Sequence, residues 1–484
     1  MPEGARNWLV PAAWVGAVTA ALLVVFPVGF PNYDTIYALV WGRELAHGAS
    51  PDYGAALPPT PHPLADLLGL VATPLGDGAI TVTMVVAYVA LALCGYLVYR
   101  LGSLWFDRAI GAVAAAIVLT RAPFLSNGLR AYVDLPYIAL CLGALTIETK
   151  RPRAGWPVLA LLALAGLLRP EAWGFAIAYW LWLALDIRRT DRSRVKREVA
   201  GSRIGWRRER SQAELAWLGL LALAGPILWV LFDAITTGEP LYSLTGTQET
   251  VETLDRRTGP VDVVLYGPRA LGEVMQWPGM VGALGGVVLG FAFLRRRSAL
   301  GLAATLLALA AFAALGAAGL AIIARYTMLA GALLSIFVAV GLLGWRLLEP
   351  GDRWRRIWQG FALLVLAMFV VWLPNQWNLD STVDADLTNQ ARIEKDLTDL
   401  VDSGAFAEPL CGKIVVPNHR AVPRLAFGLE VEPTEIVSAT EERAPRRGYY
   451  LAPASPFVIH NFILDPNDPT TFKPEVPPGY TRVA

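Results

Sequence analysis

Long apolar stretches, separated by short polar ones, run through most of this chain. Eleven of them are long enough, or nearly so, to cross a bilayer as helices, although the third, fifth and sixth are short. The pattern therefore predicts an all-α polytopic membrane protein over residues 1–374. The expected spans are 8–28, 79–99, 109–123, 131–148, 156–168, 172–187, 212–233, 275–294, 299–322, 327–345 and 357–374.

Beyond residue 374 the apolar stretches become short. The segment LTNQARIEKDLTDLVDSG has Ile393, Leu397 and Leu400 at helical spacing. GKIVVP, TEIVSAT and GYYLAPA are typical of short strands, and RAVPRLAFGLEV, between the first two, indicates a crossover helix. The pattern predicts a small C-terminal α/β domain over residues 375–484.

Composition supports a membrane protein. The chain is 55% hydrophobic and only 17% charged, which leaves too little charged surface for a soluble protein of 484 residues. The net charge of +1 gives no reason to expect a nucleic-acid partner. Cys94 and Cys141 lie in apolar stretches and Cys411 in the tail, so a disulfide framework is not expected. The N-terminus leads into an apolar stretch without a cleavage site, which indicates a retained first span.

The distribution of Lys and Arg predicts the orientation. With the N-terminus inside, the inner loops hold 23 basic residues and the outer loops hold eight. The loop 188–211 holds ten of the 23, which is typical of a segment facing anionic lipid on the inner side. An odd number of spans then places the C-terminal domain outside. We expect a plasma-membrane (inner-membrane) protein whose active site and C-terminal domain are extracytoplasmic.

The outer loop 29–78 carries an acidic residue at the edge of the membrane. PNYDTIYALVWGRELAHG predicts an amphipathic helix, lying along the outer membrane surface, with Asp34 in its first turn. Asp34 could simply stabilise the start of that helix through the helix dipole, or it could carry chemistry. The apolar stripe of this helix consists of Tyr33, Ile36, Tyr37, Val40, Trp41 and Leu45.

Further charged residues lie at the predicted outer ends of the spans. Charges near lipid are costly and tend to mark function, but each has a structural alternative: His62 as a surface histidine, Arg169 and Glu171 as a pair that ties two helices. The residues are His62 in PTPHPL, Arg169 and Glu171 in LLRPEAW, Arg325 in ARYTMLAG, and Arg130 and Asp134 in GLRAYVDLPYIAL.

One outward carboxylate and several outward arginines suit transfer of a sugar from a lipid phosphate. The departing phosphate needs cationic stabilisation, which the planar guanidinium provides with two hydrogen bonds, and the acceptor hydroxyl needs a base. No residues have metal-ligand spacing, so no obligatory metal is expected, although carboxylates brought together by folding could bind a divalent cation.

The motifs NYDTIYALVWGRELAHG, PTPHPL, LLRPEAW, FDAITTGEPLYSLTGT and ARYTMLAG resemble those of the GT-C superfamily of integral-membrane glycosyltransferases. The resemblance covers residues 1–374. It implies that Asp34 is the catalytic base and that Arg169 and Arg325, with His62, bind the donor phosphate. Thr35 departs from the Asp-Glu pair of the protein O-mannosyltransferase branch. Supporting or substrate-binding residues would be Glu171, Asp134, Arg130 and Tyr33.

The sequence therefore predicts an inverting membrane glycosyltransferase. It would move a sugar from a polyprenyl-phosphate donor to an extracytoplasmic glycan, glycolipid or protein acceptor. A multi-span transporter or lipid-linked-sugar flippase is the main alternative, and it would place ionisable residues at mid-span depth. A non-catalytic assembly partner is the third, and Asp34 would be dispensable in it.

Overall fold

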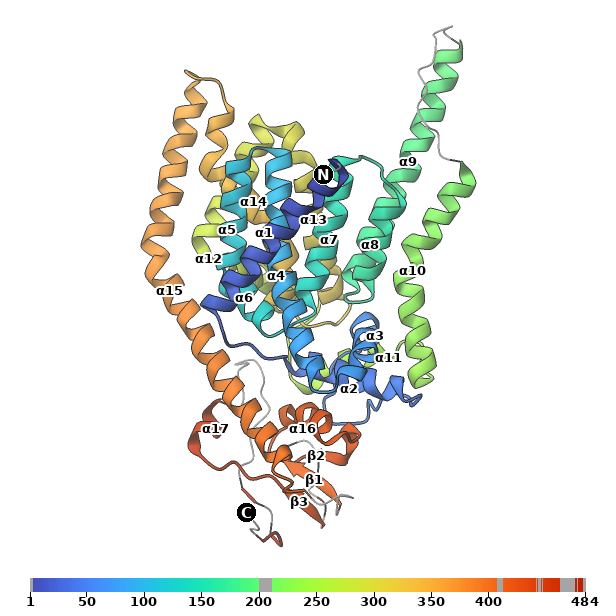
Figure 1. Ribbon diagram of the computed structural model, residues 1–484. Helices are drawn as coiled ribbons and strands as arrows, with labels where there is room; N and C mark the ends of the chain where they lie inside the picture. Colours follow the sequence, from blue (N-terminus) through green and yellow to red (C-terminus); the bar gives the residue numbers. More distant parts are fainter. Residues whose placement is uncertain are drawn as a thin grey trace.

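The computed structural model describes residues 3–199, 211–406, 412–440, 442, 445, 447–461, 475–476 and 478–481. Cys411 and much of the basic loop 188–211 lie outside the described residues. Within the described part, a helical bundle makes up most of the molecule and a small α/β layer lies beyond one of its ends (Figure 1).

The bundle consists of apolar helices, with α15 on one flank and α9 and α10 on the other (Figure 1). Each predicted span coincides with one of them. Their bounds are α1 Glu3–Val25, α4 Gly78–Trp105, α5 Arg108–Thr120, α6 Ala122–Leu129, α7 Asp134–Lys150, α8 Trp156–Gly166, α9 Glu171–Val199, α10 Gln212–Thr237, α12 Pro260–Phe293, α13 Arg295–Ala317, α14 Met328–Leu343 and α15 Arg353–Asp402.

Not every apolar helix is long enough to cross a membrane alone. Six described helices have the required length and composition, or up to seven if the bent pair α5 and α6 is one span. Shorter apolar helices occupy 9–25, 156–166 and 171–185, where the first, fifth and sixth spans are predicted. The chain is an integral membrane protein, and the count of eleven spans stays a prediction.

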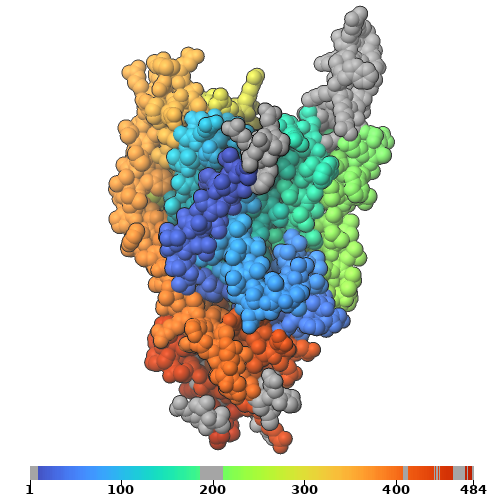
Figure 2. All heavy atoms as spheres, viewed as in Figure 1, coloured from blue at the N-terminus to red at the C-terminus, as the bar shows by residue number. Residues whose placement is uncertain are grey.

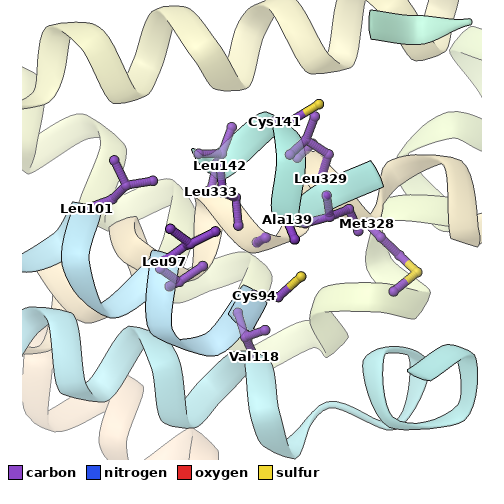
Figure 3. Packing of buried hydrophobic residues seen from close by; sticks show 14 of the residues in the cluster. Cys94, Leu97, Leu101, Val118, Ala139, Cys141, Leu142, Met328, Leu329 and Leu333 are labelled. Atoms are coloured by element: carbon purple, nitrogen blue, oxygen red, sulfur yellow. The ribbon is translucent and has the colours of Figure 1, made fainter. Parts of the chain in front are cut away.

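The centre of the bundle is α14, whose residues from Met328 to Gly341 are all buried. It lies against α12 at very close range, because a Cβ on Gly286 would come within 1.8 Å of the Phe337 carbonyl oxygen. Cys94 and Cys141 are buried free thiols in this core, among Leu97, Leu142 and Leu333 (Figure 3). The lack of a side chain at Gly286 therefore allows α12 to pack directly on α14, which is apolar on all sides and is enclosed by its neighbours.

The helix α12 is longer than predicted and is broken in the middle. Gln276 has φ 57° and separates an outer half, 260–275, from the half in the bundle. Pro278 stands two residues later; it disfavours helical geometry at Trp277 and has no N–H to donate to the preceding turn, so the helix is weakened next to the break. The sequence predicted only 275–294 as a span and missed the outer half, which lines the candidate site.

The last predicted span does not end at residue 374. It continues as α15 through Asp402, for 50 residues, with Pro374 inside the helix. Ile393 and Leu397 are buried, as their helical spacing predicts, and Leu400 packs against the same apolar cluster. A single helix therefore connects the bundle to the C-terminal domain.

The C-terminal domain contains a three-stranded parallel sheet, in the order β2-β1-β3. Its strands are β1 Lys413–Val416, β2 Ile436–Ser438 and β3 Gly448–Tyr450, and the crossover helix α16, Val422–Leu429, joins the first two. All three predicted strands and the crossover helix are confirmed. A short helix, α17 Pro456–Asn461, contacts α15.

A layer of short helices lies between the bundle and this domain (Figures 1 and 2). It contains α2 Tyr33–Ala46, α3 Pro63–Ala72 and α11 Tyr242–Thr253. The helix at Asp34 is thus confirmed, but its apolar stripe does not face lipid as an interfacial helix would. The apolar side chains of α2 form a buried cluster with the C-terminal domain, because that domain covers the stripe that was assigned to lipid.

Candidate functional site

The start of α2 is fixed by Asn32 and not by Asp34. The Asn32 side-chain oxygen accepts hydrogen bonds from the N–H groups of Asp34, at 2.8 Å, and Thr35, at 3.3 Å. The Asn32 amide donates to the Arg130 carbonyl at 2.8 Å, and the Thr35 hydroxyl donates to the Ala131 carbonyl at 2.7 Å. The helix start is therefore attached to the turn between α6 and α7, and the carboxylate of Asp34 is not used for capping.

The Asp34 carboxylate instead forms an ion pair with Arg325. The distance from Arg325 Nη1 to Asp34 Oδ2 is 3.3 Å, and the two side chains are 26% and 20% exposed. The residues lie 291 positions apart, with Arg325 just before α14. This pair shows that the segment at the start of α2 and the segment before α14 meet, and it leaves the carboxylate accessible at a cavity wall.

Arg169 lies deeper and is balanced by two acids. It forms ion pairs of 3.2 Å with Asp134 and of 3.2 Å with Glu171, and all three residues are buried. The pairs join the α8–α9 turn to the first turn of α7. The structural alternative for Arg169 thus has direct support, and its charge is already compensated.

Two tyrosines connect the arginines. The guanidinium of Arg169 lies 4.1 Å from the Tyr326 ring centre and that of Arg325 lies 5.4 Å from it. Arg130 and Arg325 each lie 5.3 Å from the ring centre of Tyr132. The negative ring faces stabilise neighbouring guanidinium groups that would otherwise repel each other. Sequence reasoning missed both tyrosines, although each stands beside a predicted site residue in RAYVD and ARYT.

His62 precedes α3 and lies against an aromatic wall. Its ring centre is 5.9 Å from that of Trp229, and its Nδ1 is buried without a hydrogen-bond partner in the described part of the chain. Burial, and next the positive charge of Arg169, lower the pKa of His62 to about 3. The imidazole is therefore neutral at physiological pH, so it can donate one N–H group but adds no positive charge.

The predicted residues line one cavity of about 990 Å³. Asp34, His62, Arg130, Arg169 and Arg325 all face it, together with Tyr33 and Glu171, whereas Asp134 reaches it through Arg169. The cavity lies among the ends of the helices that face the C-terminal domain (Figure 1). The predicted residues, from five separate parts of the sequence, therefore converge at one end of the bundle.

Part of the wall of this cavity was not predicted. It contains Arg256, Arg257 and Arg269, from the α11–α12 connection and the outer half of α12. The Arg257 guanidinium lies 3.6 Å from the Tyr266 ring centre. Its backbone carbonyl accepts a hydrogen bond from the N–H of Ile322, three residues before Arg325. The adjacent arginines in LDRRTGP were the available signal, but in the sequence they indicate only the topology.

The motif FDAITTGEPLYSLTGT joins the span α10 to this wall. Asp233, in the last turn of α10, accepts hydrogen bonds from the Ser243 N–H at 2.9 Å and from the Ser243 hydroxyl at 2.8 Å. The buried acid thereby fixes the start of α11. This role is structural and explains why the motif needs an acid and a hydroxyl ten residues apart.

Among the described residues, no group of three or more His, Cys, Asp and Glu side chains is arranged to hold a metal ion. Asp34, Asp134 and Glu171 are instead paired with arginines, and Asp233 accepts hydrogen bonds from Ser243. The arrangement provides an accessible carboxylate at Asp34, two exposed acids at Asp255 and Glu273, and several arginines, which suit a phosphate or another oxyanion.

The comparisons with known proteins concern the fold. No family model matches the chain, and no curated protein matches it by sequence. The structure of ArnT from Cupriavidus metallidurans bound to undecaprenyl phosphate superposes with a TM-score of 0.51 at 15% identity, covering 90% of both chains. The chain therefore has the fold of the GT-C superfamily, as its motifs predicted.

Two structures of the Archaeoglobus fulgidus oligosaccharyltransferase are also similar. One, complexed with Zn and sulfate, gives a TM-score of 0.48 at 12% identity and covers 88% of this chain. The other, AglB with an inhibitory peptide and a dolichol-phosphate, gives 0.46 at 12% identity and covers 87%. The chain spans 61% and 64% of the length of these two proteins.

Proposed function

We propose that the protein is an inverting membrane glycosyltransferase that moves a sugar from a polyprenyl-phosphate donor to a hydroxyl of an extracytoplasmic glycan, glycolipid or protein. The observation that carries this proposal is the Asp34–Arg325 pair at the wall of an arginine-lined cavity at the end of a membrane bundle. A donor anchored in lipid presents its phosphate at this depth, so the phosphate can reach the arginines while the lipid chain remains in the bilayer.

In the proposed step, Asp34 takes the proton of the acceptor hydroxyl. The acceptor oxygen forms a bond to the anomeric carbon on the face opposite the phosphate, and the bond from that carbon to the phosphate oxygen breaks. The electron pair leaves with the polyprenyl phosphate, and the configuration inverts. Arg325 orients Asp34 before the reaction, and Arg325 and Arg257 stabilise the charge on the departing phosphate.

His62 and Arg169 have supporting roles in this scheme. The neutral His62 imidazole packs on Trp229 at the cavity wall without adding charge to it. Arg169 holds Asp134 and Glu171 and packs on Tyr326, which in turn positions Arg325. This assignment places Arg169 one step farther from the phosphate than the resemblance implied.

The position of the cavity favours an enzyme over a transporter. A transport path needs ionisable groups near the bilayer midplane, between two halves of a bundle. Here the charged lining comes from helix ends, and the centre of the bundle at α14 is closely packed and apolar.

The decisive experiment is the Asp34→Asn variant. The amide keeps the size of the side chain but cannot accept the proton, so we expect sugar transfer to fall by roughly two to four orders of magnitude. Purified protein in lipid nanodiscs, with a radiolabelled polyprenyl-phosphate sugar and membrane-extracted acceptors, would provide the assay. Asp77→Asn is the matched control, because Asp77 is exposed in the same outer loop and lies outside the cavity lining. Near-normal transfer by the Asp34→Asn protein would contradict the proposal.

A further inference from the structure

The C-terminal sheet presents its functional edge to the cavity. In open parallel sheets, ligands bind outside the carboxyl ends of the strands. The strand β1 ends at Val416. His419 and Arg420, which come directly after Asn418, both line the cavity. The Asn418 side chain accepts a hydrogen bond from the Arg420 N–H at 3.0 Å and so fixes the turn that carries them.

This edge is held in place by contacts with the outer layer. The Arg43 guanidinium, on α2, donates hydrogen bonds to the Ala426 and Phe427 carbonyls at 3.0 Å each and to the Val431 carbonyl at 3.2 Å. The Thr434 N–H donates to the Asp52 carboxylate at 2.8 Å. Each of these hydrogen bonds joins residues more than 380 positions apart, one in the C-terminal domain and one in the segment 43–52. Tertiary contacts therefore hold the edge of the sheet at the cavity.

Asp34 lies between this edge and the bundle. Its neighbour Tyr33 packs edge-to-face on His419, with 5.4 Å between ring centres, while Asp34 itself reaches Arg325. The domain lies beyond the end of the bundle, with the layer of short helices between them (Figure 1). A lipid-anchored donor approaches Asp34 from the bundle side, so the molecule that meets Arg420 is the acceptor.

We infer that the β1–α16 connection is the acceptor-binding element, and that Arg420, assisted by His419, binds an oxyanion that the acceptor sugar carries near its reacting hydroxyl. The inference rests on the proposed function and adds the chemical class of the acceptor. A guanidinium at the wall of a cavity favours a carboxylate or phosphate, because its fork forms two charge-assisted hydrogen bonds with either.

Binding to the full-length protein in nanodiscs tests this inference. The probes are methyl glucuronide and glucose 6-phosphate, with methyl glucoside as the matched neutral sugar. We expect at least one anionic sugar to bind about tenfold more tightly than the glucoside. Arg420→Gln should reduce that preference to about twofold or less, and Arg420→Lys should keep part of it, because a point charge remains.

Lys413→Gln is the control, since Lys413 stands at the opposite end of the same strand, outside the cavity lining. This variant should keep the full preference. Equal binding of all three sugars by the wild-type protein would overturn the inference, and so would a preference that survives Arg420→Gln. Undecaprenyl phosphate is measured in parallel: if it binds while the anionic sugars show no preference, only the acceptor inference fails, whereas its failure to bind counts against the proposed function.

Discussion

At the residue scale, the site depends on which arginines are already committed to protein carboxylates. Arg169 is buried between Asp134 and Glu171, whereas Arg257 is exposed and contacts an aromatic ring. An oxyanion ligand would compete with two carboxylates for Arg169 but would meet Arg257 directly. We therefore expect the two residues to differ in function, although both line the same cavity.

This difference predicts opposite behaviour of two variants. Arg257→Gln should raise the KM for the lipid-phosphate donor by about tenfold, because one charge-assisted contact is worth about 1.5–3 kcal/mol at most. Arg169→Lys keeps the charge but loses the bidentate geometry, so it should lower the melting temperature and change the donor KM less than threefold. Donor titrations and thermal unfolding of both proteins separate the effects. A large donor KM change in Arg169→Lys, with unchanged stability, would return Arg169 to direct phosphate binding.

The sequence revealed the charged residues and the Arg169–Glu171 pair, but not the long-range partners. Asp34, Arg325, Arg169 and His62 stood out because charges and a histidine near apolar spans are rare and costly. The pairing of Asp34 with Arg325 joins residues 291 positions apart, and no local pattern encodes it. The same holds for Arg420, which looks like an ordinary surface residue until the tail folds back over the outer loop.

At the element scale, the crossing of α2 and α3 positions the segment that carries Asp34 and His62. A Cβ on Gly42 would lie 2.3 Å from the Gly69 backbone, and one on Gly69 would lie 2.2 Å from the Ala38 carbonyl oxygen. The helices can approach this closely only because both positions lack a side chain.

Gly42→Leu should therefore separate α2 from α3 and move Asp34 relative to His62. We expect transfer activity to fall at least tenfold, and the melting temperature to fall by several degrees, because the clash is with backbone that cannot rotate away. Gly48 is unsuitable as a control, because its φ of 77° would strain any other residue. Gly16 and Gly174 have no positive φ and have open space around them. Gly174→Leu is thus the control, and a similar loss of activity in it would refute the argument.

The boundaries of helices and strands were predictable where the apolar pattern was continuous. The prediction failed where a change in backbone conformation sets the boundary. The strands of the tail followed from short runs such as GKIVVP. The outer half of α12 was missed because its apolar residues are interspersed with Asp262, Arg269 and Glu273, and its break at Gln276 requires a positive φ that no residue type there announces.

At the scale of the whole molecule, the two ends of the bundle are distinct. The far end of α9 and the start of α10 lie at the end opposite to the C-terminal domain (Figure 1). This arrangement agrees with the charge distribution, which placed the loop 188–211 inside and the domain outside.

Cysteine labelling in intact cells tests which end faces out. Ser211 and Ser403 are exposed at opposite ends, and the buried thiols of Cys94 and Cys141 should stay unreactive. In a background without Cys411, a membrane-impermeant maleimide should label Ser403→Cys in intact cells and Ser211→Cys only after the membrane is opened. The reverse pattern would place Asp34, the cavity and the C-terminal domain on the inner side and would exclude an extracytoplasmic acceptor.

Because α15 is one continuous helix, its length sets both the position and the orientation of the C-terminal domain relative to the bundle. A helix of 50 residues is about 75 Å long, and each residue advances it by 1.5 Å and rotates it by about 100°. The part of α15 beyond Pro374 therefore determines the distance of the C-terminal domain from the bilayer. It also determines the rotation of the domain about the helix axis, and so the direction in which the edge of its sheet points. One residue added near Ser381 would turn Arg420 away from Asp34 with almost no change in height, whereas seven added residues would restore the direction and raise the domain by about 10 Å. Insertions in this part of α15 would therefore keep the direction of the sheet edge only when they add about two whole helical turns. A larger acceptor would have to be accommodated by substitutions in the cavity walls.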